Sequence, residues 1–286
     1  EDLAANKITS IQAIINGTTN YILTRMAGEG VDFASALKQA QELGYAEANP
    51  KNDVEGIDAA YKLAILATLA FHSQVRPEDI YQQGISRLGA RDFRYAQELG
   101  YAIKLLAMAR EREEGIEARV HPTLVPQDTP LAQVSGVYNA VQVEGDLIGR
   151  VIFYGEGAGA LPTTSAVLAD VLAIARRIYQ DTPAPVRPTL EKRKPIIPMA
   201  QVQTRYYMRM NVADRAGVLG QIARVLGEHN ISIASVIQKE SDPQAQTAEI
   251  VIMTHPAREA AVQRALEETT RLGVVKEISN LIRVEG

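Results

Sequence analysis

The chain has 286 residues, of which 46% are hydrophobic and 22% charged, and its formal net charge is −4. This length allows two domains with separate cores. The net negative charge does not favour binding to nucleic acid or to an anionic membrane surface. Cysteine is absent, which excludes disulfides, thiolate catalysis and cysteine-ligated metal sites.

No targeting or membrane segment is evident in the sequence. The longest apolar run, Leu63 to Phe71, is too short to cross a bilayer, and no signal-peptide pattern opens the chain. We therefore expect a cytoplasmic protein without a nucleic-acid or membrane partner. Residues 1–6 resemble the middle of a helix, so we expect the chain to be part of something longer.

The first 182 residues mix helical and strand patterns. Asp32 is placed to cap a helix that Gly44 would end in the left-handed conformation. A second helix is expected from about residue 56 to 70, with its half from residue 63 buried on all sides. Thr163 is placed to cap a last helix over residues 165–179. Strands are expected at 101–108, 116–120, 140–143 and 151–154.

Because these strands cluster and helices flank them, the pattern predicts an α+β domain with a mixed sheet. Five prolines between residues 183 and 198 then predict an extended linker. We place the first domain at residues 1–182, the linker at 183–203 and a second domain at 204–286. In the second domain, strands and helices are expected at 206–212, 217–229, 231–237, 249–253, 258–272 and 274–278. This βαββαβ order is that of a ferredoxin-like fold.

Residues 43–62 contain the densest group of candidate catalytic and binding residues, with acidic side chains and a lysine around one loop and the start of one helix. Asp58 and Lys62 are four residues apart and would share one helix face, while Glu47 lies in a loop that can fold back over them. Desolvation at the edge of the apolar half would make the Lys62 ammonium a usable acid or base. Such a cluster suits a zwitterionic substrate. The alternative is an ordinary surface ion pair worth a few tenths of a kcal/mol.

Three glycine-containing turns are further candidates. The segment 16–22, which includes Thr18, is typical of a strand end turning into a helix whose backbone N–H groups can meet a carboxylate. Residues 155–165 hold Gly157 and Gly159 but lack the spacing of a dinucleotide-binding loop. In the second domain, Asp214 is placed to cap a helix, and Gly217 permits close approach of an amino-acid carboxylate. Simple N-caps are the alternative reading of the first and third turns.

The four histidines show no metal-ligand or catalytic-triad spacing, so no metal site is expected, and His121 is expected to be structural.

Taken together and in order, these segments resemble homoserine dehydrogenase, and the second domain is similar to an ACT domain, a small-ligand regulatory module. The resemblance covers nearly the whole chain and rests on residues 15–22, 44–62, 119–122 and 155–165 with Asp170. It implies NAD(P)-dependent interconversion of L-aspartate 4-semialdehyde and L-homoserine, in threonine, methionine and isoleucine biosynthesis.

The resemblance also implies residue roles. Glu47, Asp53 and Asp58, with Thr18 nearby, would hold the substrate, and Lys62 would handle the proton at the reacting oxygen together with Asp58. Gly157 and Gly159 would lie beside the nicotinamide. The effector, with threonine expected, would bind at Asp214, Gly217, Val218 and Leu219.

The family's dinucleotide-binding domain has no counterpart in these residues. We therefore expect NAD(P) in the complete enzyme, none held by this chain alone, and no turnover by it. A homodimer or homotetramer is expected. The alternative is a non-catalytic amino-acid-binding regulatory and dimerisation module.

Overall fold

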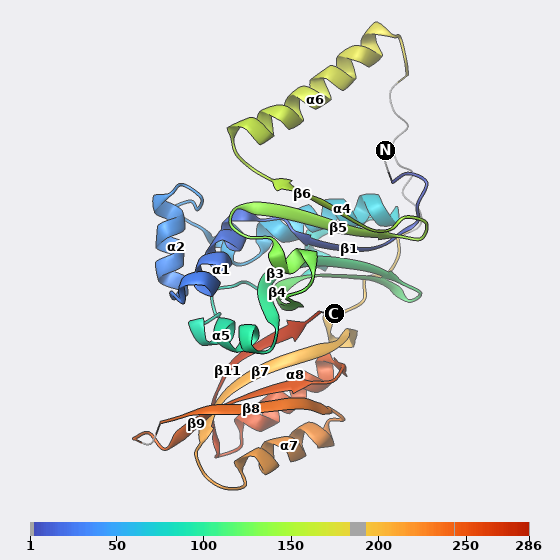
Figure 1. The fold of residues 1–286 in the computed structure, drawn as a ribbon. Helices are drawn as coiled ribbons and strands as arrows, with labels where there is room; N and C mark the ends of the chain where they lie inside the picture. The colour runs from blue at the N-terminus through green and yellow to red at the C-terminus, as the bar shows by residue number, and fades with distance from the viewer. Residues whose placement is uncertain (1–2, 184–192, 243, 286) are drawn as a thin grey trace.

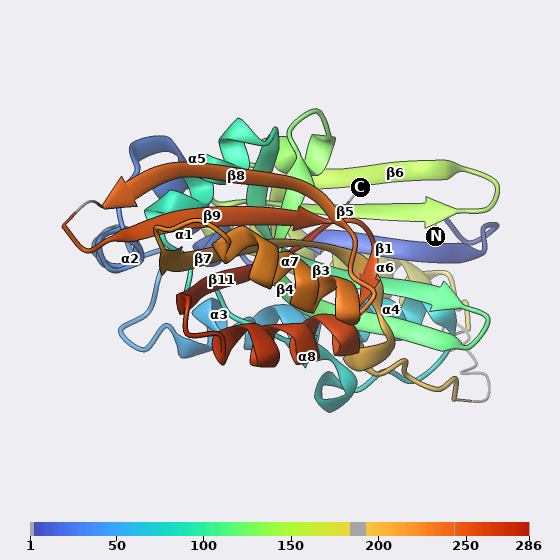
Figure 2. The ribbon, with the colours of Figure 1, turned by 90° about the horizontal axis from the view of Figure 1, so that it is seen from below.

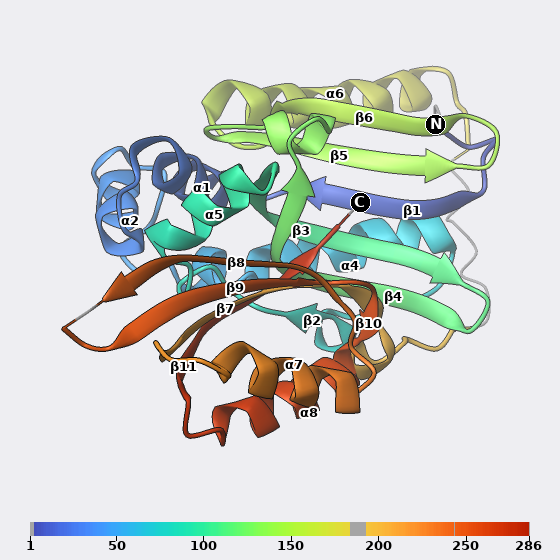
Figure 3. The ribbon, with the colours of Figure 1, turned by 60° about the horizontal axis from the view of Figure 1, so that its bottom comes forward.

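The structure, a computed structural model, describes residues 3–183, 193–242 and 244–285. Its centre is an eleven-stranded sheet that runs through both halves of the chain in the order β6-β5-β1-β3-β4-β11-β7-β9-β8. Two short strands lie off this path, β2 beside β4 and β10 beside β7. Figure 3 shows β6, β5, β1, β3 and β4 following one another in the first half, and β11, β7, β9 and β8 following one another in the second.

The first half supplies strands β1 to β6 and helices α1 to α6. The strands are β1 (Ile8–Ile14), β2 (Tyr81–Gln82), β3 (Tyr101–Arg112), β4 (Gly115–Pro126), β5 (Tyr138–Gly145) and β6 (Gly149–Glu156). The helices are α1 (Gly17–Glu29), α2 (Phe33–Glu42), α3 (Lys51–Val54), α4 (Ile57–Phe71), α5 (Ala90–Glu98) and α6 (Ala160–Tyr179). Helix α1 packs on β3 and β5 and helix α4 on β1, β3 and β4, whereas α6 stands apart from this body (Figure 1).

The second half has the predicted βαββαβ order. It consists of β7 (Gln203–Ala213), α7 (Val218–Glu228), β8 (Ile233–Asp242), β9 (Thr247–Thr254), the short β10 (Ala257–Arg258), α8 (Glu259–Thr270) and β11 (Val275–Val284). Figure 2 shows α7 and α8 side by side on one face of these strands. The α+β fold expected from the sequence is confirmed.

Several local predictions hold and others fail. Asp32 caps α2, where its carboxylate accepts a hydrogen bond from Ser35 N, and Gly44 has a positive φ. Thr163 does not cap α6, because that helix already begins at Ala160 after Gly159 and has no side-chain cap. Residues 3–6 form a turn and not a helix.

The apolar half of α4 is not buried on all sides. Ile65 and Leu69 are 62% and 53% exposed, because only the opposite face of the helix meets the sheet. The described part of the expected linker also packs on the first half. Lys194 donates to the carbonyl of Phe71 and the carboxylate of Glu111, and Ile196 forms a bridge with Ile116.

The two halves are joined by strand pairing. At its end, β11 runs parallel to β4, with Arg283 opposite Thr123 and Val284 opposite Leu124. Buried Tyr207, Val251 and Ile282 of the second half belong to the same hydrophobic cluster as Ile103 and Leu124 of the first. The predicted two domains therefore share one sheet and part of one core.

Asp92 of α5 is the main polar contact between the halves. Its side chain is fully buried and accepts hydrogen bonds from Arg209 Nε at 2.7 Å, Asn280 Nδ2 at 2.8 Å and Tyr207 Oη at 3.2 Å. Burial alone would lower the pKa of Arg209, but its hydrogen bonds and ion pairs with Asp92 and Glu249 raise it, so the guanidinium stays charged.

Replacing Asp92 with alanine is expected to destabilise the protein by about 3–5 kcal/mol, because it leaves a buried cation with one carboxylate fewer. Urea unfolding measures this loss. The control is Glu228→Ala, which removes an exposed partner of Arg224 at 3.2 Å and should cost about 0.5 kcal/mol or less. Equal losses in the two variants would show that the buried carboxylate does not hold the halves together.

Candidate functional site

Asn16 organises the polar cluster at the start of α1. Its Oδ1 accepts a hydrogen bond from Thr19 N at 2.9 Å and so caps the helix. Its Nδ2 donates to Asp53 Oδ1 at 2.7 Å and to Asp58 Oδ2 at 2.9 Å. One buried carboxamide therefore holds two carboxylates from α3 and α4 in fixed positions.

Lys62 completes this cluster from the next turn of α4. Its Nζ lies 2.7 Å from Asp58 Oδ2 and 3.1 Å from the carbonyl oxygen of Ile15. The side chain of Lys62 is 48% exposed and that of Asp58 is 30% exposed. The pair predicted from the four-residue spacing is present, but the expected desolvation of Lys62 is absent in this chain, since the lysine projects from the open face of α4.

Two glycines let the backbone close around the cluster. A Cβ at Gly157 would lie 1.9 Å from Asn139 Nδ2, and a Cβ at Gly17 would lie 2.7 Å from the carbonyl oxygen of Val137. Neither position can carry a side chain without displacement of β5 or its flanking residues. The glycine segment after β6 is thus held against the start of α1.

These segments line one cavity of about 590 Å³. Among the predicted residues, it brings together Thr18, Asp53, Asp58, Lys62, Gly157 and Gly159. The structure does not bring in Glu47: its side chain is exposed outside the lining, and Tyr45 borders the cavity in its place. The loop is held in this position by Thr18, whose hydroxyl donates to Tyr45 O at 2.6 Å.

Sequence reasoning missed Asn16 and Asn139 as lining side chains. The signal for Asn16 was available, because an asparagine before the glycine that opens a helix is a preferred N-cap. Its contacts with Asp53 and Asp58 span 37 and 42 residues, and no local pattern predicts them. Asn139 lies in a strand with no distinguishing motif.

A second, smaller cavity lies at the start of α7. It has a volume of about 220 Å³, and its lining includes all four predicted effector residues, Asp214, Gly217, Val218 and Leu219. The prediction that Asp214 caps α7 is wrong, because Gly217 is the N-cap, with a φ of 86°, and no side chain caps the helix. The carboxylate of Asp214 is thus not engaged in capping.

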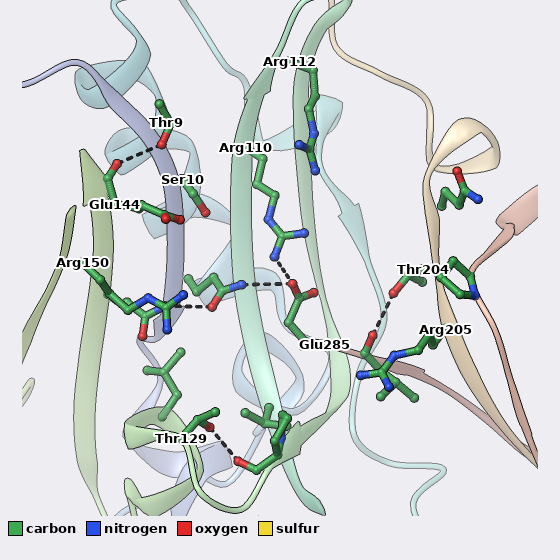
Figure 4. A pocket seen from close by; sticks show the side chains of 18 of the residues that line it. Thr9, Ser10, Arg110, Arg112, Thr129, Glu144, Arg150, Thr204, Arg205 and Glu285 are labelled. Carbon is green, nitrogen blue, oxygen red and sulfur yellow. Dashed lines mark hydrogen bonds and ion pairs between the residues drawn. The ribbon is translucent and has the colours of Figure 1, made fainter. Parts of the chain in front are cut away.

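A broad groove of about 810 Å³ lies on the sheet face opposite α1 and α4 (Figure 4). Some of its charged side chains form ion pairs within the groove and others pair with residues outside it, as Glu111 does with Lys194 and Arg112 with Glu117. Arg110 forms an ion pair with Glu285, which also accepts a hydrogen bond from Gln12 at 3.1 Å. Burial lowers the pKa of Arg110 to about 10. This groove has no cluster comparable to the one around Asn16.

His121 is buried, and desolvation lowers its pKa well below the usual value, in keeping with a structural role. Over residues 3–183, 193–242 and 244–285, the side chains form no cluster of three or more metal-ligating groups. The same residues include no helix long and apolar enough to cross a membrane.

Comparison with known proteins identifies both halves. The homoserine dehydrogenase family model matches residues 1–172, and the ACT domain model matches residues 206–274. The chain is 47% identical to a homoserine dehydrogenase of Neisseria gonorrhoeae and 46% identical to one of Synechocystis, over 100% and 99% of its length. It covers 67% of each of these relatives.

Solved structures agree with this. The crystal structure of a homoserine dehydrogenase from Thiobacillus denitrificans matches the whole chain with a TM-score of 0.93 at 44% identity, and the chain covers 66% of it. A hyperthermophilic archaeal homoserine dehydrogenase mutant, solved in complex with NADPH, matches 64% of the chain with a TM-score of 0.52 at 31% identity. The chain spans about two thirds of the length of most of these relatives. It therefore belongs to the homoserine dehydrogenase family and carries an ACT domain.

Proposed function

We propose that this chain provides the substrate-binding and regulatory part of a cytoplasmic enzyme that interconverts L-aspartate 4-semialdehyde and L-homoserine with NAD(P). The observation that carries the proposal is the placement of Asp53, Asp58 and Lys62 around Asn16 in one cavity. Two carboxylates suit the ammonium group of an amino acid, and a neighbouring lysine suits an oxygen that gains or loses a proton.

The roles follow from which atoms are already engaged. Asp58 Oδ2 accepts from Asn16 and Lys62, and Asp53 Oδ1 accepts from Asn16. The second oxygen of each carboxylate is left to accept from the substrate ammonium. We assign to Lys62 Nζ the proton that is donated to the aldehyde oxygen during reduction and taken from the hydroxyl during oxidation.

When bound, NAD(P) supplies or accepts the hydride. Gly157 and Gly159, which line the substrate cavity, are proposed to lie beside the nicotinamide, because neither has a side chain that would cover the backbone there. These glycines alone do not provide the helix-terminal phosphate site of a dinucleotide-binding fold. The polypeptide of residues 1–286 is accordingly proposed to hold no NAD(P).

Lys62→Met is expected to weaken L-homoserine binding at least tenfold, about 1.4 kcal/mol, because the substrate hydroxyl loses its charged partner. Isothermal calorimetry on the 286-residue polypeptide measures this. Lys38→Met is the matched control, since Lys38 also pairs with an acid four residues away, Glu42 at 3.8 Å. This variant should bind L-homoserine as tightly as the unmodified chain does.

The same polypeptide is expected to show no turnover with NADPH and aspartate semialdehyde. Binding that is unchanged in Lys62→Met, or turnover close to that of a full-length relative, would contradict these assignments.

Gly157→Ala is expected to reduce L-homoserine affinity at least tenfold, because the added methyl would occupy the position of the Asn139 amide and push it into the cavity. Gly155→Ala, where nothing lies within 4 Å, is the control. A second change, Asn139→Gly in the Gly157→Ala background, removes the clash. The prediction fails if Gly155→Ala and Gly157→Ala bind equally.

A second candidate function is amino-acid sensing by a non-catalytic module. The cavity lined by Asp214 and Gly217 supports it, because the open end of α7 favours a carboxylate and Asp214 can accept from an ammonium. We propose this loop as the effector site, with threonine as the effector. If the chain were only a sensor, calorimetry would detect an amino acid there and no homoserine at Lys62.

We also propose that the chain forms a homodimer or homotetramer. The sheet ends in two edge strands, β6 and β8, and Phe153 and Tyr154 of β6 are 49% and 59% exposed. Sedimentation at micromolar concentration is expected to show a dimer or a larger species. A single monomeric species at that concentration would contradict self-association.

A further inference from the structure

A third cavity, of about 760 Å³, lies between the two halves of the chain. The first half contributes the α3–α4 junction and the segment after β2, and the second half contributes α8 and β11. We refer to it as the interdomain cleft. None of its lining residues is shared with the cavity around Asn16 or with the one at the start of α7.

The first-half wall of the cleft carries uncompensated positive charge. Lys51 and Arg87 are both exposed, and neither side chain has a carboxylate partner in the described parts of the chain. Glu55 stands on the same wall, where its Oε1 accepts from Ser86 Oγ at 3.1 Å and its Oε2 is left for another donor. An amino-acid zwitterion carries one ammonium and one carboxylate. Glu55 can bind the ammonium, and the two cations, Lys51 and Arg87, can both bind the carboxylate of the ligand.

The opposite wall mixes apolar side chains with polar ones, and its cation, Arg283, is paired with Glu259. Leu266 of α8 and Ile278 of β11 face the cleft, and Ile57 joins them from α4. Ser279 lies at an irregularity in the pairing of β11 with β7, between Ile278 and Asn280. Ser279 thus adds a polar side chain beside Ile278, and such a mixture of apolar and polar groups is typical of sites for small ligands.

We propose that the interdomain cleft binds a small L-α-amino acid, with the carboxylate at Lys51 and Arg87, the ammonium at Glu55, and the side chain against Ile57 and Ile278. This site is distinct from the substrate cavity and from the effector loop at the start of α7.

The position of the cleft gives the ligand a route to the substrate cavity. Helix α3 separates the two spaces: Lys51 and the following Glu55 line the cleft, whereas Asp53 between them lines the substrate cavity and accepts from Asn16. The helix is packed closely on the segment after β2, because Ile85 N donates to Val54 O at 2.8 Å and Gly84 has no space for a Cβ there. A ligand that links α3 to Arg87 fixes the helix that carries Asp53.

The consequence for substrate affinity rests on the proposed function, whereas the binding itself does not. By linkage, an amino acid in the cleft and homoserine in the substrate cavity must alter each other's affinity by the same factor.

Isoleucine-methyl NMR on the whole chain tests the proposal. The probes are the proteinogenic L-amino acids and L-homoserine, each titrated to millimolar concentration. At least one is expected to shift the methyl signals of Ile57 and Ile278 saturably. Ile250, which lines the cavity at the start of α7, reports on that other site.

Lys51→Met with Arg87→Met is expected to weaken the response at Ile57 and Ile278 at least tenfold. Glu55→Gln, which keeps the hydrogen bond with Ser86, tests the ammonium contact separately. Lys38→Met with Arg224→Met removes two exposed cations elsewhere and is the control. Unchanged methyl spectra in the absence of ligand establish that the variants fold.

The proposal is overturned if no amino acid shifts Ile57 and Ile278, if shifts occur only at Ile250, or if the double variant responds as the unmodified chain does. Loss of homoserine binding in Lys62→Met remains the separate test of the substrate cavity, so failure of one assignment does not conceal failure of the other.

Discussion

The buried carboxylate of Asp92 sets how the two halves of this protein meet. It is taken fully out of water, a costly step that is offset because Arg209, Asn280 and Tyr207 donate to it, in addition to the backbone N–H of Gly89. The three side-chain donors come from the second half, so they fix its orientation on α5. With that orientation set, the end of β11 can pair with β4 and the sheet continues from one half into the other.

A second buried arginine links this junction to the substrate side. Arg283 of β11 forms an ion pair with Glu259 of α8 and donates to Gln83 at 2.6 Å and to Tyr81 at 3.1 Å in the first half. Its hydrogen bonds to Glu259 raise its pKa against the effect of burial, so it remains a cation. The segment that it holds is the one on which α3 rests. The ACT domain is therefore built into the support of the substrate cavity.

Much of the fold was accessible from sequence because its signals are local. The order of strand and helix patterns predicted the βαββαβ arrangement of the second half, and the four-residue spacing predicted the Asp58–Lys62 pair. What could not be predicted depends on distant segments. The parallel pairing of β11 with β4 joins residues 160 positions apart in sequence, Arg283 and Thr123, and no periodicity encodes it.

The misplaced residues have equally physical causes. Glu47 was expected in the cavity from its position in the chain, but the turn that places Tyr45 there is set by the contact with Thr18. Lys62 was expected to be desolvated because its neighbours are apolar, whereas only one face of α4 meets the sheet. Composition identifies an apolar helix but does not determine which of its sides is covered.

Helix α6 is an apolar helix that no other part of the described chain covers, and this affects its dynamics. It has 20 residues, and none of them is buried. Even its apolar side chains Leu161, Ile178 and Tyr179 are 82%, 75% and 92% exposed. A helix of this length without tertiary contacts gains little beyond its own backbone hydrogen bonds, and its ends unwind on a submicrosecond timescale. Its amide protons should therefore exchange with solvent much faster than those of β3 or β7. Any surface that packs on its apolar side would slow this exchange.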